Sequence, residues 1–329
     1  MAGGRLHFER GSATKVRTNF PHGLPVSLAV LNPDLVANPE SYQQRFRRAA
    51  PFPHLVIDNF FVDDFARSLT ETFPAFEAGN AMGDDGKLGG KSTFDRIRKL
   101  GPHYATLDSL VQSSAFLNII EKMTGIDKLL FDPFYLGGGT HENRDGMSLD
   151  AHVDFNYHSS ERWHRRLNLI IYLNHEWLPA WGGSLQLWSD PHASAGADVS
   201  VPPLFNRAVI FETSERSWHG FDRINLPNDK KHIARKSIAL YFYTHDRPEH
   251  EIVGRHSTVY VKHALPTHFA AGHVLTKSDV THLQHLIADR DQHIAMQYAE
   301  NTRLLQAQDQ GFSGKVLYLM KRAYVRMRR

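Results

Sequence analysis

Hydrophobic and polar positions alternate with a period of two through the middle of the chain, a pattern that is typical of β-strands. These runs are short, rich in β-branched and aromatic residues, and separated by turn residues such as Gly182 and Gly183. The clearest strands are expected at residues 167–173, 184–188, 207–212 and 235–243. Such a series predicts an antiparallel sandwich or barrel between about residues 133 and 244.

Helical periodicity precedes this region. A strand starting near Pro51 leads to an amphipathic helix at residues 63–73, and a second helix is expected at residues 104–123. The segment 79–92 between them is rich in glycine and charged residues and contains few hydrophobic side chains that could be buried. We therefore expect a mobile loop there.

A long helix is predicted after the strands, at residues 278–307, with Ser278 or Thr276 as its N-cap. The expected fold class is mainly β with flanking helices (α+β). The chain divides into a lead segment, a core, and a connector followed by a C-terminal helical extension with a basic tail, at residues 1–50, 51–245 and 246–329.

Composition narrows the class of protein. With 329 residues, of which 41% are hydrophobic, the chain can bury a substantial core. It has no apolar run long enough for a transmembrane segment and no signal-peptide-like start, so a cytoplasmic location is expected. The absence of cysteine excludes disulfides, thiolate nucleophiles and zinc ribbons. Any metal must therefore be held by histidine and carboxylate.

The formal net charge of +3 arises at the C-terminus. Residues 315–329 contain six basic residues and no acidic residue, so the rest of the chain is net acidic. We therefore expect no nucleic-acid partner. The tail 315–329 is expected either to pack on the body or to contact an anionic membrane surface or an acidic partner.

One short motif indicates a metal site. His152 and Asp154 are two apart in an expected strand, so both can point into one cavity. His219 comes several strands later, where a closed sandwich can bring it beside them. Two histidines and one carboxylate leave coordination positions open, as in non-haem Fe(II) oxygenases. In a chain with 21 histidines such a motif also arises by chance, so the surrounding residues matter.

A second group suggests a carboxylate-binding clamp. In an expected strand that follows His219, Arg235 and Ser237 share one face with Ala239 and Tyr241. An arginine can hold a carboxylate through two parallel hydrogen bonds, which fixes the orientation of a dicarboxylate. In the strand after the first metal ligands, Asn168 and Tyr172 share a face that is expected to line the same cofactor pocket.

Taken in order, the sequence pieces of residues 51–244 resemble the 2-oxoglutarate/Fe(II) oxygenases of the prolyl 4-hydroxylase-like group. These pieces are PFPHLVIDNFF, GGGTHENRDGMSLDAHVDFNYH, RRLNLIIYLNHEW, WGGSLQLW, AVIFETSERSWHG and RKSIALYFYT. The resemblance implies a double-stranded β-helix core of the jelly-roll or cupin-like kind. It differs from many prolyl 4-hydroxylases in one position, because Arg235 stands where they use lysine.

The resemblance also implies the roles of the site residues. His152, Asp154 and His219 would hold Fe(II), Arg235 and Ser237 would bind the 5-carboxylate of 2-oxoglutarate, and Tyr172 would hydrogen-bond the same co-substrate. The implied reaction consumes O2, converts 2-oxoglutarate to succinate and CO2, and hydroxylates a C–H bond, with ascorbate as reductant in vitro. An intact Asp154 disfavours halogenation, which requires that position to be vacant.

The substrate is less constrained by the sequence. The segments 79–92 and 156–165 are candidate lids. The residues considered as substrate contacts are His158, Trp163, Arg96 and His141. No peptide groove can be read, so we expect a small biosynthetic substrate such as an amino acid, peptide or sugar intermediate. The alternatives are a hydroxylase of prolyl or other residues in a protein, and a non-catalytic β-sandwich sensor that binds a metal or ligand.

Overall fold

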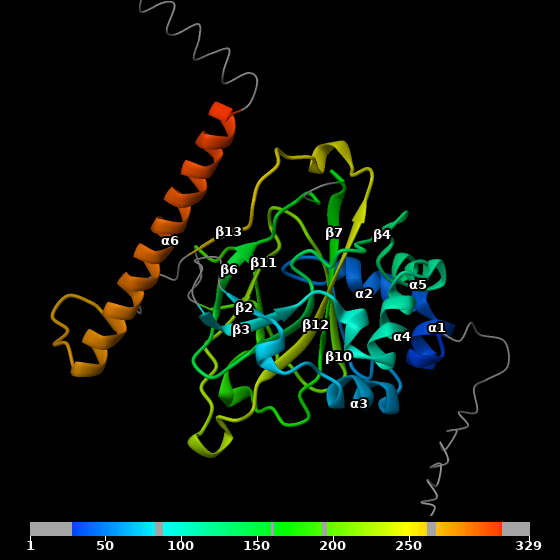
Figure 1. Cartoon of the computed structure of the whole chain (residues 1–329), viewed down its shortest axis with the longest axis horizontal. Coiled ribbons are helices and arrows are strands. Elements are labelled where there is room, and N and C mark those ends of the chain that lie inside the picture. The colour runs from blue at the N-terminus through cyan, green and yellow to red at the C-terminus, as the bar shows by residue number, and fades with distance from the viewer. Residues whose placement is uncertain (1–27, 83–87, 159–160, 193–195, 262–267, 311–329) are drawn as a thin grey trace, which may run out of the picture.

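The computed structural model describes residues 28–82, 88–158, 161–192, 196–261 and 268–310. The predicted basic tail at 315–329 lies outside the described residues. Figure 1 shows two sheets at the centre, helices α1–α5 gathered against one of them, and a long helix, α6, that extends away from this body.

Two antiparallel sheets form the core. One has eight strands in the order β1-β10-β7-β12-β5-β3-β2, with β4 paired to β12, and the other has five in the order β13-β6-β11-β8-β9. The bounds are β1 His54–Ile57, β2 Asn80–Met82, β3 Leu88–Phe94, β4 Leu130–Phe131, β5 Gly139–Asn143, β6 Leu149–Val153, β7 His164–Tyr172, β8 Leu185–Trp188, β9 Val199–Val201, β10 Arg207–Glu212, β11 Trp218–Phe221, β12 Arg235–Thr244 and β13 Val259–Tyr260. The predicted mainly β fold class is confirmed.

Alternation along the central strands separates the core from the site. In β7 and β12, Leu169, Ile171, Ile238 and Leu240 point toward the helices and belong to the main hydrophobic core. The residues between them face the five-stranded sheet. The helices are α1 Pro33–Ala37, α2 Gln43–Arg48, α3 Asp63–Glu71, α4 Pro102–Val111, α5 Ser114–Thr124 and α6 Lys277–Gln310. Short 3-10 helices occur at Leu28–Val30, Pro39–Tyr42, Phe76–Ala78, Ile97–Leu100, Pro179–Trp181, Asn228–Lys230 and Glu249–Glu251.

Two local predictions need correction. The single helix expected at residues 104–123 is two helices, because the Ser113 hydroxyl caps the start of α5 by accepting a hydrogen bond from the Phe116 amide at 3.2 Å. The mobile loop expected at 79–92 is largely a hairpin. In it β2 pairs with β3, and β3 pairs with β5, for example Lys91 with Asn143. The turn of this hairpin, residues 83–87, lies outside the described residues.

The long C-terminal helix is confirmed, and Thr276 is its cap. The Thr276 hydroxyl accepts a hydrogen bond from the Asp279 amide, and the Asp279 carboxylate accepts one from the Thr276 amide. The hydrophobic residues Val280, Ile287, Ile294 and Tyr298 of α6 are exposed. None of the described helices is both long and apolar enough to cross a lipid bilayer.

The described part of the lead segment belongs to the main core. Leu31, Leu35 and Phe46 are buried in the same cluster as the central strands. Residue Leu31 also forms a β-bridge with Phe61, which follows β1. The helices before β1 therefore contribute directly to the stability of the sheet that they cover.

We predict that Phe46→Ala lowers the free energy of unfolding by about 3 to 5 kcal/mol, because Phe46 is fully buried and its removal leaves a cavity. The exposed neighbour Gln44 offers a matched control in the same helix, and Gln44→Ala should change stability by no more than about 0.5 kcal/mol. Urea unfolding of the full chain measures both. Equal, small effects would show that this segment is not part of the core.

Candidate metal centre

The three predicted metal ligands meet between the sheets. His152 in β6 and His219 in β11 are direct partners in the antiparallel register, and their ring centroids are 4.2 Å apart. Asp154 follows β6, with its carboxylate oxygens 3.8 Å from His152 Nε2 and 3.4 Å from His219 Nε2. One donor atom from each residue lies within 4.8 Å of the others, a spacing at which all three can bind one ion.

Backbone contacts fix which imidazole nitrogen is available. His152 Nδ1 lies 2.9 Å from the Asp150 carbonyl, and His219 Nδ1 lies 2.8 Å from the Ser217 carbonyl. A carbonyl only accepts, so both Nδ1 atoms carry the proton and both Nε2 lone pairs point at the site. Burial, followed by the neighbouring His219, lowers the pKa of His152 to about 3. Burial also lowers the pKa of His219. Both imidazoles are therefore in the neutral form that metals require.

The Asp154 carboxylate is held by residues of the opposite sheet. Asn168 Nδ2 donates to Asp154 Oδ2 at 2.8 Å, and Arg165 Nη2 lies 3.2 Å from the same oxygen. Burial raises the pKa of this carboxyl, but the Arg165 guanidinium, together with the hydrogen bond from Asn168, outweighs it and holds the pKa well below its usual range. Asp154 is thus ionised and oriented before any metal binds.

Arg165 is a site residue that sequence reasoning missed, since it was assigned to the end of the insert 156–165. It is buried and is the second residue of β7. Its guanidinium lies 3.7 Å from the Tyr241 ring centroid and 4.4 Å from that of Phe155. Its Nε and Nη2 atoms both donate to Asn168 Oδ1, and its Nη1 has no hydrogen-bond partner among the described residues.

A β-bulge explains why the alternation hid Arg165. In the pairing of β7 with β12, Leu167 lies opposite Phe242 but Arg165 lies opposite Tyr243, so Arg166 is the extra residue. Strict alternation from Asn168 would point Arg166 into the site. Instead Arg166 forms an ion pair with Glu212 at 2.8 Å, and Arg165 turns inward.

Arg235 provides a buried positive charge on the same cavity. It is 4% exposed, donates from Nε to the Gly183 carbonyl at 2.7 Å and from Nη2 to the Tyr172 hydroxyl at 3.2 Å, and forms no ion pair with another described residue. Burial lowers its pKa. The Asp222 carboxylate offsets this burial only in part and forms no ion pair with Arg235, so this position suits an anionic ligand. Ser237, also buried, follows on the same face of β12.

These residues surround one cavity of about 310 Å³. Its walls include the metal triad, Asn168, and the alternate residues of β12 that the sequence placed on one face, namely Arg235, Ser237, Ala239 and Tyr241. Tyr172 does not line the cavity. Its hydroxyl instead accepts the hydrogen bond from Arg235 and so helps to fix the position of the guanidinium. Asn168 does line it, and its amide is engaged with Asp154 and Arg165.

The four candidate substrate contacts separate into two groups. His141 lines the cavity, opposite Ser237 in the pairing of β5 with β12. His158, Trp163 and Arg96 are not among its lining residues. His158 is buried beside Asp132, with its ring against Trp163 and Tyr243, whereas Arg96 is an exposed side chain near Asp95. Lining residues that the sequence did not suggest include Lys91, Thr258 and Tyr260.

Comparison with known proteins agrees with this geometry. Residues 138–243 match the family model described as the 2OG-Fe(II) oxygenase superfamily. The chain is 28% identical over 196 residues to prolyl 3-hydroxylase OGFOD1 of Mus musculus, a match that covers 59% of this chain and 33% of the mouse protein. The chain thus spans about a third of the length of this curated relative.

Two solved structures are also similar. A prolyl hydroxylase of Trichoplax adhaerens, in complex with a peptide fragment of the hypoxia inducible factor oxygen degradation domain, is 15% identical with a TM-score of 0.45, covering 64% of this chain and 93% of that chain. HygX of Streptomyces hygroscopicus, with nickel, 2-oxoglutarate and hygromycin B bound, is 13% identical with a TM-score of 0.41, covering 58% of this chain and 82% of that chain.

We predict that His152→Ala, Asp154→Ala and His219→Ala each weaken Fe(II) binding on the order of 100-fold or more, because each removes one of three protein donors. Equilibrium dialysis under argon measures the affinity. His141→Ala is the control, since His141 lies in the same cavity but its Nε2 is 3.1 Å from the Gly137 carbonyl. Loss of iron in the His141 variant, with binding retained in a triad variant, would contradict the assignment.

Proposed function

We propose that this chain, whose residues 138–243 form an oxygenase domain of the 2OG-Fe(II) superfamily, is a dioxygenase that hydroxylates an unactivated C–H bond of a small biosynthetic substrate. One observation carries the proposal. A preorganised set of two imidazoles and one carboxylate shares a buried cavity with Arg235, a guanidinium that has no carboxylate partner among the described residues.

The residues fit both groups that this reaction requires. His152, Asp154 and His219 would hold Fe(II), and Arg235 and Ser237 would hold the far carboxylate of 2-oxoglutarate, with Tyr172 supporting Arg235. When bound, the iron and 2-oxoglutarate together supply the O2 activation that hydroxylation needs, with release of succinate and CO2.

The protein's own contribution is orientation and charge. Asn168 and Arg165 hold Asp154 ionised and in a fixed direction, and the backbone carbonyls of Asp150 and Ser217 fix the two imidazole tautomers. His152 and His219 are each only 5% exposed, and electrostatic interactions are stronger where bulk water is excluded. Few side chains have to move when the ligands bind, because their hydrogen bonds already exist.

The edges of the two sheets favour a small substrate over an extended peptide. The edge of β6 near the metal ligands is paired with β13, and the edge of β5 is paired with β3. A peptide that binds by strand addition needs an unpaired edge at this position. The second candidate, a hydroxylase of prolyl residues in a protein, is favoured by the similarity to prolyl 3-hydroxylase OGFOD1.

Incubation of the protein with Fe(II), ascorbate and 2-oxoglutarate, followed by measurement of succinate, tests the activity. A panel of amino acids, nucleotide sugars and proline-containing peptides then tests the substrate class, by stimulation of succinate formation and gain of one oxygen atom in the product. Tight binding of Fe(II) and 2-oxoglutarate without succinate would instead identify the non-catalytic sensor. Stimulation by peptides alone would favour the protein hydroxylase.

We predict that Arg235→Ala weakens 2-oxoglutarate binding by about 2 to 5 kcal/mol, because it removes a desolvated partner of the co-substrate carboxylate. Binding of Fe(II) should be unchanged. The adjacent Lys236→Ala is the control, because Lys236 points to the other face of β12, where it lies 5.1 Å from the Phe73 ring. Calorimetric titration with 2-oxoglutarate distinguishes them. A larger loss in the Lys236 variant would place the anchor there instead.

A further inference from the structure

A short strand from the C-terminal connector lies beside the metal ligands. In β13, Val259 pairs with Val153 and Tyr260 pairs with His152, and the Val261 amide donates to the Ala151 carbonyl at 2.7 Å. This strand follows both the family-matched segment and residue 245, where the sequence placed the end of the core. It is nevertheless an edge of the same five-stranded sheet that carries His152 and His219.

Tyr260 contacts a metal ligand directly. Its ring centroid is 5.1 Å from that of His152, with an angle of 32° between the ring planes. Because β6 lies between β13 and β11, the His152 imidazole has Tyr260 on one side and His219 on the other. Tyr260 and Thr258 both line the cavity, whereas the side chain of Val259 between them is 43% exposed.

The connector is fastened to the segment that follows Asp154. Asn156 donates from Nδ2 to the Gly254 carbonyl at 2.9 Å, and its Oδ1 accepts from the His256 amide at 3.0 Å. On the other side, the His256 ring lies 2.8 Å from the Glu215 carboxylate, in the loop that leads to His219. A two-sided amide clamp of this kind fixes the backbone two residues before Thr258.

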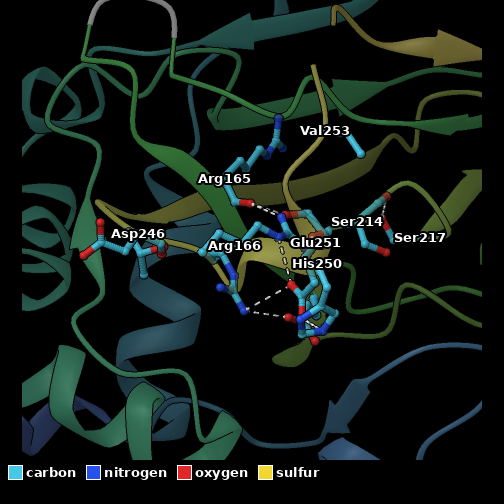
Figure 2. A network of polar contacts seen from close by, with 12 residues as sticks. Arg165, Arg166, Ser214, Ser217, Asp246, His250, Glu251 and Val253 are labelled. Carbon is cyan, nitrogen blue, oxygen red and sulfur yellow. Dashed lines mark hydrogen bonds and ion pairs between the residues drawn. The ribbon is translucent and has the colours of Figure 1, made fainter. Parts of the chain in front are cut away.

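A second attachment lies nearer the start of the connector (Figure 2). The Arg247 side chain is 7% exposed. It donates to the carbonyls of Arg165 at 3.2 Å and Thr213 at 2.8 Å, and it pairs with Glu251 at 2.9 Å. Figure 2 shows Glu251 beside Arg166 in the same network. The connector is therefore held to β7 and to the loop before β11 along its course, which leaves β13 little freedom to move away from β6.

We propose that this connector supports the metal site and that Tyr260 is a positioning residue that holds the His152 imidazole in its orientation. The proposal rests on the proposed Fe(II) site. The hydrogen bond from His152 Nδ1 to the Asp150 carbonyl fixes one edge of the imidazole, and the Tyr260 ring restricts its rotation, so that Nε2 stays directed at the ion. The connector thereby contributes to the proposed metal site from outside the family-matched residues 138–243.

Titration of the full-length protein with Co(II), followed by calorimetry and by the visible d–d bands of the bound ion, tests this role. Tyr260→Ala should weaken Co(II) binding roughly 2- to 13-fold, which corresponds to the loss of one aromatic contact, and should alter the d–d bands. Tyr260→Phe keeps the ring and should restore both. Val259→Ala, on the opposite face of the same strand, should change neither. The melting temperature of each metal-free variant reports on folding.

A second variant tests Tyr260 indirectly, by removing the Asn156 side chain that fastens the connector. Asn156→Ala should release the connector and weaken Co(II) binding in the wild-type background, but should add little in the Tyr260→Ala background, since both act through the same contact. If Tyr260→Ala does not fold, Tyr260→Leu replaces it, keeping bulk without the aromatic ring, with the same expected direction.

The outcomes separate this inference from the proposed function. Unchanged affinity and unchanged d–d bands in Tyr260→Ala, or additive effects in the double variant, would overturn the role of Tyr260 while leaving the metal site intact. Failure of the wild-type protein to bind Co(II), or undiminished binding by His219→Ala, would overturn the proposed metal site and this inference together.

Discussion

The Asp154 carboxylate lies between two sheets and is only 12% exposed, so its charge has to be compensated inside the protein. Asn168 and Arg165 of β7 supply the compensation, so the contact also joins the eight-stranded sheet to the five-stranded sheet. Arg165 in turn is held between Phe155 and Tyr241. The orientation of Asp154, one of the three proposed metal ligands, depends on this charged link.

Much of the framework could be predicted because it follows local periodicity. The alternation in β7, β10 and β12 is strict enough to give their bounds to within a few residues and to place Arg235, Ser237 and Tyr241 on one face. The two-residue spacing of His152 and Asp154 likewise follows from strand geometry.

The features that were not predicted arise from long-range pairing or from local irregularity. The periodicity of hydrophobic residues along the chain reveals neither of these. The β2–β3 hairpin has little hydrophobic pattern of its own, and β3 is ordered by pairing with β5. The strand β13 is only two residues long and is defined by pairing with β6. Arg165 points inward because of a bulge, and His158 is buried because Asp132, distant in sequence, lies beside it.

The most direct test of the central claim is anaerobic absorption spectroscopy of the wild-type protein with Fe(II) and 2-oxoglutarate. We predict a visible charge-transfer band that requires both components, saturates at one equivalent of each, and decays when O2 is admitted, with formation of succinate. A protein that binds Fe(II) but gives no such band with saturating 2-oxoglutarate would contradict the assignment of His152, Asp154, His219 and Arg235 to one catalytic site.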